Sequence, residues 1–292
     1  MKIQSIINAI ESATDPNHRI PSTTIDQLII GDSDQDAHGI VTSFMATVDV
    51  INAAIRLGAN FIITHEPTWF DGHDRESLMQ DDSVYQAKRE LIAKHNLVIY
   101  RFHDHMHFGG AHDMIVAGVA KELGWSDYLL PGDPAGKNVL ERAETRFMLP
   151  KTTLAEVLNT VRTRLKLGGV RYIGDVSQPV ENVAALIGGA TLGLGDEYNP
   201  IKQIRDQRID LVISGDIEEW TVPAYIRDAN RLGHPCAMLV IGHERSEESG
   251  MKWLPEWLAD KFNLKAQWLD AGDPFERVLF ETTNNSKSLR SN

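Results

Sequence analysis

The sequence predicts an α/β fold in which mostly parallel sheets are flanked by helices and one structural plan occurs twice. Short runs of β-branched and aliphatic residues indicate strands that are buried on both faces, as in parallel sheets covered by helices. Such runs lie at 61–64, 97–102, 211–214 and 237–242. The order of the expected elements, α-β-β-α-β-α-β-α, also recurs in the second part of the chain.

Residues 1–130 are expected to form the first half. It begins with a helix, because isoleucines recur at helical spacing between Ile3 and Ile10. A polar turn at 32–36 then separates two short strands. The expected elements after the first helix are strands at 27–31 and 40–45, a helix at 48–57, a strand at 61–64, a helix at 84–95, a strand at 97–102 and a helix at 114–123.

Residues 145–292 are expected to form the second half, after a passage rich in Gly and Pro. An extended segment at 146–149 precedes a helix whose apolar stripe runs from Leu154 to Val161. The elements expected next are strands at 170–174 and 183–188, a helix at 195–207, a strand at 210–214, a helix at 222–232, a strand at 237–241 and a final helix from about 249.

Short sequence motifs recur at matching points of the two halves. Ile-Gly-Asp occurs at 30–32 and at 173–175, and Ala-Thr follows the second strand of each half. We interpret these echoes as internal duplication, with chance recurrence as the alternative. Under duplication, equivalent strand ends face one another, and a cleft between the halves collects side chains from both.

Composition excludes several classes of protein. The net charge of -12, with no dense basic tract, argues against nucleic-acid binding. No apolar run is long enough to span a membrane, and neither a secretory signal nor a dinucleotide or phosphate-loop fingerprint is present. The single cysteine, Cys236, excludes an intramolecular disulfide. We therefore expect a cytoplasmic protein that acts on a small molecule.

Candidate metal ligands follow three of the predicted strands. His65 and Glu66 come directly after one strand, a His-Asp-His-Met-His word follows the next at 103–107, and His243 follows the last. Ligands of open α/β sheets bind at the carboxyl ends of the strands. Pro67 favours a turn that lets His65 and Glu66 address two neighbouring ions. The alternative for this pair is a structural histidine beside a solvated glutamate.

The segment 103–107 contains three histidines within five residues. His103, His105 and His107 share one face if the backbone stays extended, with Asp104 on the other. Neutral imidazole suits zinc, iron, copper or nickel, and one of the three histidines can orient a ligand instead of binding.

Near the C-terminus, His243 and Glu247 are four residues apart. Ser246 is a plausible N-cap for the final helix, which would place a carboxylate in its first turn. The alternative is a capping network of Ser246, Glu247 and Glu248 without a metal.

The motifs around these candidate ligands resemble motifs of the Ngg-one-interacting-factor-three-like (NIF-three-like) family, whose members are often named type-two GTP cyclohydrolase I homologues. The likeness spans nearly the whole chain and implies two intertwined halves with mixed sheets, assembled as a homohexameric ring. The matching words are Thr64-His65-Glu66-Pro67, His103-Asp104-His105-Met106-His107, Gly215-Asp216 and Gly242-His243-Glu244-Arg245-Ser246-Glu247.

The resemblance implies a pair of divalent ions held by His65, Glu66, His107, His243 and Glu247, and His103 is a further candidate ligand. Two ligands depart from the family pattern. Glu66 replaces a histidine and His107 replaces an aspartate, so three imidazoles and two carboxylates remain. This donor set favours a retained binuclear site and accepts zinc, iron, manganese or nickel.

A third departure concerns proton transfer. Trp220 stands where many relatives have a histidine after the Gly-Asp turn. Glu218 or Glu219 are candidates to take over any role of that histidine.

The function predicted from the sequence is a dinuclear-metal-dependent hydrolase. Two cations would acidify a bridging water, and Asp104, His105 and Glu244 are the candidate proton carriers. The family name implies ring-opening hydrolysis of a purine nucleotide, although no residue specifies a guanine pocket. The alternatives are a non-enzymatic metal-binding regulatory or scaffold protein and, less favoured, a metal-storage or delivery protein.

Overall fold

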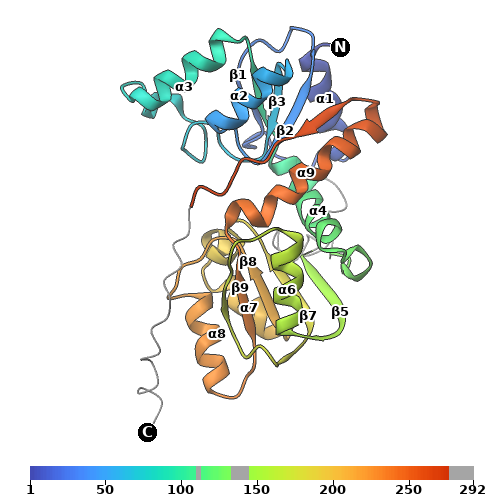
Figure 1. The fold of residues 1–292 in the computed structure, drawn as a ribbon, viewed down its shortest axis with the longest axis vertical. Helices are drawn as coiled ribbons and strands as arrows, with labels where there is room; N and C mark the ends of the chain where they lie inside the picture. Colours follow the sequence, from blue (N-terminus) through green and yellow to red (C-terminus); the bar gives the residue numbers. More distant parts are fainter. Residues whose placement is uncertain (110–112, 133–144, 276–292) are drawn as a thin grey trace.

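The computed structural model describes residues 1–109, 113–132 and 145–275 and contains two mixed five-stranded sheets, one above the other in Figure 1. This architecture confirms the predicted α/β fold. Most of the passage between the predicted halves, residues 133–144, lies outside the described part of the chain. The strands of the first sheet, in spatial order, are β1 (Gln27–Ile30), β4 (Val98–Arg101), β3 (Phe61–Thr64), β2 (Ile40–Ser43) and β10 (Ala266–Trp268).

The second sheet resembles the first at its centre and at one edge. Each sheet has three parallel strands at its centre and an antiparallel strand at the matching edge, β1 beside β4 and β6 beside β9. The central strands are buried, which explains their unbroken apolar sequences. In spatial order the second sheet contains β5 (Arg146–Thr153), β7 (Pro179–Leu186), β8 (Leu211–Ser214), β9 (Ala237–Val240) and β6 (Arg171–Ile173).

The helices cover the sheets and begin at recognisable caps. Thr47, Asp82 and Asp113 each accept a backbone N–H at a helix start, and Thr153 forms a capping box with Glu156. The helices are α1 (Ile3–Thr14), α2 (Val48–Leu57), α3 (Ser83–Lys94), α4 (Met114–Leu123), α6 (Leu154–Arg164), α7 (Asn199–Asp206), α8 (Val222–Arg231) and α9 (His243–Phe262), with short 3-10 turns at Glu76–Leu78, Ser126–Tyr128 and Ala190–Gly195.

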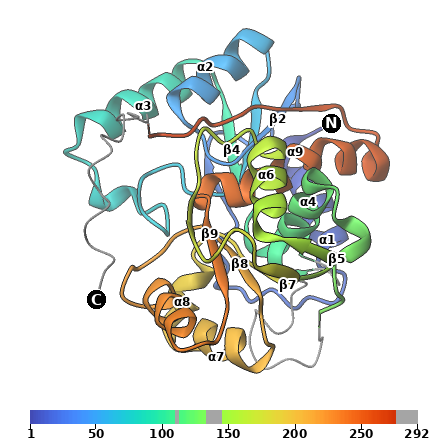
Figure 2. The ribbon, with the colours of Figure 1, turned by 60° about the horizontal axis from the view of Figure 1, so that its bottom comes forward.

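The helix α9 joins the two halves. It begins after β9 of the second sheet, runs between the two sheets in Figures 1 and 2, and leads into β10, which pairs in parallel with β2 of the first sheet. Strand β10 was not predicted, because three residues of mixed polarity are too few to show a strand pattern. The final helix also starts earlier than the predicted residue 249, with Gly242 instead of Ser246 at its cap.

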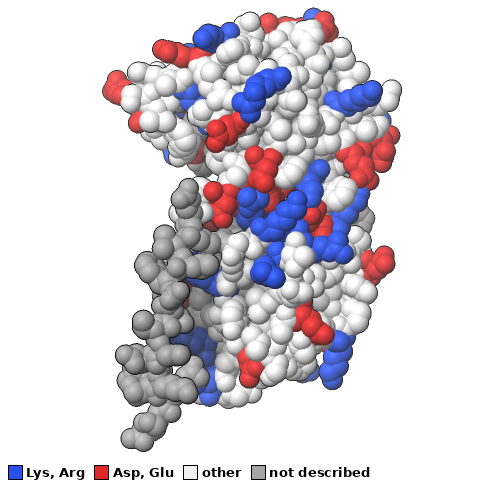
Figure 3. Space-filling model, in the orientation of Figure 1, with Lys and Arg blue, Asp and Glu red and all other residues white. Residues whose placement is uncertain are grey.

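The helix α4 crosses α9 at two glycines. A Cβ atom on Gly118 would lie 2.6 Å from the Cα atom of Gly250, so only glycine permits this approach. Charged side chains of both signs gather at this waist of the molecule (Figure 3). Lys252 and Glu122 pair across the two helices at 2.6 Å. One apolar core cluster contains residues of both halves, so the halves are packed as one unit.

Within the described ranges, no helix combines the length and apolar character that crossing a bilayer requires. The thiol of Cys236 is free and buried, and burial raises its pKa to about 12.

Candidate metal centre

The predicted ligands meet between the two sheets. Thr64 and Arg101, the last residues of β3 and β4, are paired in the parallel ladder, so the segments that follow them start side by side. The start of α9 approaches this edge from the second sheet, because its first residue, His243, comes directly after the β9 strand and its turn. Two strand ends of one half and one helix of the other therefore supply the candidate ligands.

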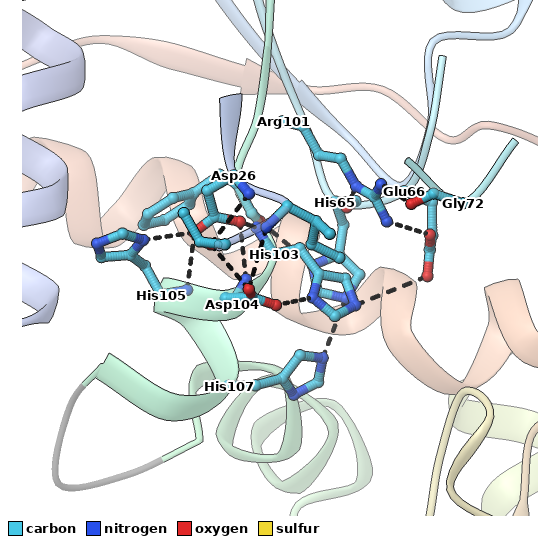
Figure 4. Close-up of polar contacts among 12 residues, drawn as sticks. Asp26, His65, Glu66, Gly72, Arg101, His103, Asp104, His105 and His107 are labelled. Carbon is cyan, nitrogen blue, oxygen red and sulfur yellow. Dashed lines mark hydrogen bonds and ion pairs between the residues drawn. The ribbon is translucent and has the colours of Figure 1, made fainter. Parts of the chain in front are cut away.

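The backbone after β4 is helical, so the condition under which His103, His105 and His107 would share one face is not met. Residues His105–Gly109 form a π-helical turn, and the N–H groups of Met106 and His107 both donate to the carbonyl oxygen of His103. Residues four apart share a face in such a turn, so the rings of His103 and His107 approach to 4.9 Å between centroids. His105 points the other way, as Figure 4 shows.

Asp26 holds the start of this turn. Its carboxylate accepts the backbone N–H groups of His103, Asp104 and His105, and it also bonds to Nδ1 of His105. Asp26 precedes β1, and nothing in the local sequence marks it as a partner of residues almost eighty positions away. The structure therefore places His105 in a structural contact outside the group of predicted ligands.

Glu247 lies at the middle of the centre. Its Oε2 atom is 3.0 Å from Nε2 of His243 and 3.4 Å from Nε2 of His65, and its Oε1 atom is 3.9 Å from Nε2 of His107. Glu247 is buried, and the contacts of its Oε2 atom with the two imidazoles do not have the geometry of ordinary hydrogen bonds. A carboxylate in this position can bridge two cations.

The two sides of Glu247 carry different donors. The nitrogen-rich side contains His65, His103 and His107, and the Nε2 atoms of His65 and His107 are 3.1 Å apart. On the oxygen-rich side, Glu66 and Glu247 itself supply carboxylate oxygens, and Oε1 of Glu66 lies 3.1 Å from Nε2 of His243. In the two groups His65–His103–His107 and His65–Glu66–Glu247, the donor atoms lie within 4.8 Å of one another.

Every imidazole of the centre has its Nδ1 atom beside an oxygen that can only accept. In the neutral ring Nδ1 then carries the hydrogen, and the Nε2 lone pair faces the centre. Lone pairs that converge in this way repel one another unless protons or cations lie between them. The pairs are His65 with the Phe102 carbonyl at 3.3 Å, His103 with Asp104 at 3.0 Å, His107 with Asp113 at 2.8 Å and His243 with Asp216 at 2.7 Å.

The pKa values of His107, His243 and Glu247 also favour positive charge at the centre. Burial alone would lower the pKa of His107, but Asp113 and then Glu247 raise it to about 9. Burial likewise opposes charge on His243, yet its bonds to Asp216, Glu247 and Glu66 raise its pKa to about 12. Burial raises the pKa of Glu247, and the adjacent histidines more than reverse this and hold it well below the usual range. These donors therefore fit divalent cations.

Gly188 makes room for Glu247. It follows β7, has a φ of +52°, and a Cβ atom there would lie 2.0 Å from Glu247 Oε1. Its N–H donates to Oγ of Ser246 at 2.9 Å, and that hydroxyl donates to the His243 carbonyl at 2.7 Å. Ser246 is thus inside α9, where it fixes the turn after β7, and is not the predicted N-cap. In the sequence, Gly188 and Gly189 at the end of a predicted strand are the signal that could have indicated this close approach.

The predicted proton carriers occupy three different environments, and that of His105 is the contact with Asp26 described above. Asp104 bonds to His103 and accepts the hydroxyl of Thr24 at 2.7 Å, so it orients a candidate ligand. Glu244 is buried, which raises its pKa to about 7, and it lies in a carboxylate group with Glu248 and Asp270. Nη1 of Arg245 is 2.7 Å from Glu248, so a positive charge already lies beside the carboxylates of Glu244, Glu248 and Asp270.

A cleft of about 1120 Å³ opens beside the centre. Glu66, Asp216, His243 and Glu244 line it together with apolar residues such as Phe44. Trp220 does not line it and is 67% exposed in the loop after β8. Glu219 pairs with Arg171 at 3.5 Å, with both side chains largely exposed. The cleft therefore brings Glu244, but neither Trp220 nor Glu219, close to the candidate metal ligands.

Comparisons with known proteins found related sequences. The family model of Duf34/NIF3 (NGG1p interacting factor 3) matches residues 1–272. A Clostridium perfringens protein named GTP cyclohydrolase 1 type 2 homolog is 24% identical over 283 residues, which cover 95% of this chain and 100% of that protein. A Clostridium acetobutylicum protein of the same name is 26% identical over 254 residues, 85% of each chain.

Solved structures show the same fold. The crystal structure of Staphylococcus aureus protein SA1388 superposes with a TM-score of 0.71 at 20% identity, covering 95% of this chain and 99% of that one. A Bacillus cereus protein related to NIF3 superposes with a TM-score of 0.68 at 19% identity and the same coverage. At this level of identity the likeness establishes the fold alone.

Proposed function

The chain belongs to the Duf34/NIF3 family, as its motifs predicted, and from this membership and the geometry of its centre we propose that it is a dinuclear-metal-dependent hydrolase of a small molecule. One observation carries the proposal: the Nε2 atoms of His65, His107 and His243 face two carboxylates around the buried side chain of Glu247. His65, Glu66, His107, His243 and Glu247 would hold two divalent ions, with His103 as an additional donor.

Two bound cations supply Lewis acidity, which lowers the pKa of water and stabilises negative charge on a carbonyl or phosphoryl oxygen. The chain's own residues set the geometry around them. Asp104, Asp113 and Asp216 fix the imidazoles through Nδ1, so that Nε2 is directed inward. Glu244 lines the adjacent cleft, and a pKa of about 7 suits a group that accepts and returns a proton near neutral pH.

The substrate is proposed by class only. The relatives are named for GTP cyclohydrolase, so a purine nucleotide is one candidate for hydrolysis in a cleft of about 1120 Å³. A cytoplasmic homohexamer without nucleic-acid or membrane partners belongs to the same proposal, and light scattering of the purified protein tests the assembly.

The function is tested by metal analysis together with turnover. Purified protein is loaded with zinc, manganese, iron or nickel, its metal content is measured by mass spectrometry, and phosphoester, amide and nucleotide substrates are screened. We expect two ions per chain and turnover that Glu247→Gln abolishes. Glu256→Gln, which changes an exposed residue of the same helix, is the matched control. Two bound ions without turnover of any substrate would favour the regulatory or scaffold alternative.

A further inference from the structure

The two oxygens of Glu66 have different neighbours. Oε1 faces the centre, 3.1 Å from Nε2 of His243 and 3.9 Å from Nε2 of His103, whereas Oε2 lies 3.1 Å from Nη2 of Arg101. We propose that Arg101 is a positioning residue that makes Glu66 a one-oxygen donor and thereby sets the affinity of the oxygen-rich side for its cation. This inference rests on the proposed function and assigns a residue outside the predicted ligands.

Arg101 is held rigidly. It is the last residue of β4 and only 2% exposed. Its Nε atom donates to the His65 carbonyl at 3.2 Å, and Nη1 donates to the Gly72 carbonyl at 2.7 Å (Figure 4). Nη1 also lies 3.7 Å from Asp74 Oδ2. Because all three nitrogens have partners, the planar guanidinium cannot turn away from Glu66 without losing the other contacts.

This arrangement leaves Glu66 with one oxygen directed at the centre. A free carboxylate can bind a cation through one or both oxygens, but the bond to Arg101 engages Oε2 and leaves Oε1 for the centre. The guanidinium also supplies a positive charge beside Glu66, which shares the His65–Glu66–Glu247 group with a second carboxylate. A lysine would keep the charge, yet a single ammonium cannot reproduce three fixed contacts.

Removal of the guanidinium should weaken the binding of one cation only. Partners that orient metal ligands typically contribute about 10–100-fold to metal affinity. We therefore expect Arg101→Met to weaken binding of the ion on the oxygen-rich side by roughly that factor, and Arg101→Lys to have a smaller effect. The ion on the side of His65, His103 and His107 should keep its affinity.

The test is chelator competition with zinc and manganese, combined with metal counting and thermal unfolding. Arg75→Met is the matched control, because Arg75 belongs to the neighbouring loop, is 57% exposed and pairs with Asp71 at 2.6 Å, away from the centre. If Arg101→Met does not fold, Arg101→Lys is compared with Arg75→Lys in the same way. Unchanged affinity for both ions in folded Arg101 variants would overturn the inference.

A double-mutant cycle separates positioning from a general structural role. In a Glu66→His background there is no second oxygen to hold, so Arg101→Met should cost little further affinity. Equal loss in both backgrounds would show that Arg101 acts through the loop at Gly72 and Asp74, and would also overturn the inference. A wild-type protein that binds no cation would refute the proposed function itself, a result distinct from either of these.

Discussion

The fit of Gly188 against Glu247 yields a quantitative prediction. In Gly188→Ala the new Cβ atom would lie 2.0 Å from Glu247 Oε1, 2.7 Å from its Cδ atom and 3.1 Å from Nε2 of His243. Glu247 must move, which overpacks the centre at a cost of about 1–3 kcal/mol. The left-handed backbone of residue 188 adds about 1–2 kcal/mol for alanine. We expect a loss of about 2–5 kcal/mol in the free energy of unfolding, together with loss of bound metal.

Two other glycines provide matched controls. Gly189 has a φ of -87° and open space around its Cβ position, so Gly189→Ala should change stability by less than about 0.5 kcal/mol. Gly58 has a φ of +69° but no atom within 4 Å of the Cβ position, so Gly58→Ala isolates the backbone cost of about 1–2 kcal/mol. Urea unfolding and metal counting on the three variants separate strain from displacement of Glu247.

The outcome that contradicts this reasoning is specific. If Gly188→Ala were no less stable than Gly58→Ala and kept its metal, Glu247 would have room that the structure denies it. The close approach after β7 would then not define the position of this carboxylate.

Three further predictions concern the same region. Asp113→Ala removes the Nδ1 partner of His107 and should weaken metal binding about 10–100-fold in chelator competition, and unchanged binding would show that the Nδ1 bond does not orient the ring. Gly118→Val forces α4 away from Gly250 and should destabilise the protein by about 1–3 kcal/mol in urea unfolding; an unchanged midpoint would contradict the observed crossing. In the metal-free protein, the pKa of His107 is raised from 6.5 to about 9, so the stabilisation from its added proton is fully present below pH 6.5 and is lost as pH rises through 9. Because a metal must displace that proton, the metal-induced rise in melting temperature should grow over this pH range, and a shift independent of pH would contradict the assignment of His107 as a ligand.

Strand ends were the most predictable part of this molecule. Buried parallel strands have continuous apolar sequences, so the positions of His65 and Glu66 after β3 followed from local pattern alone. The shared face considered for His103, His105 and His107 required an extended backbone, whereas the carboxylate of Asp26 favours a helical turn there. That carboxylate comes from a distant segment, and a local pattern carries no information about it.

The partners that orient the ligands were harder to predict. Asp113 is visible in the sequence as a helix N-cap and Asp216 as a turn residue, and each of these roles already accounts for the residue type. Their bonds to His107 and His243 each lie within one half but depend on the helical turn after β4 and on the pairing of β8 with β9. Arg101 ends an apolar strand, where sequence alone gives no reason to expect a buried guanidinium.

The return of the chain from α9 to β10 has a consequence for biosynthesis. The first sheet lacks its β10 edge until residue 268 has been made, after every other strand of both sheets. Glu247 also emerges from the ribosome late, when His65 and Glu66 have long been exposed on the nascent polypeptide. A growing chain therefore cannot complete the cation-binding centre before Glu247 has left the ribosome.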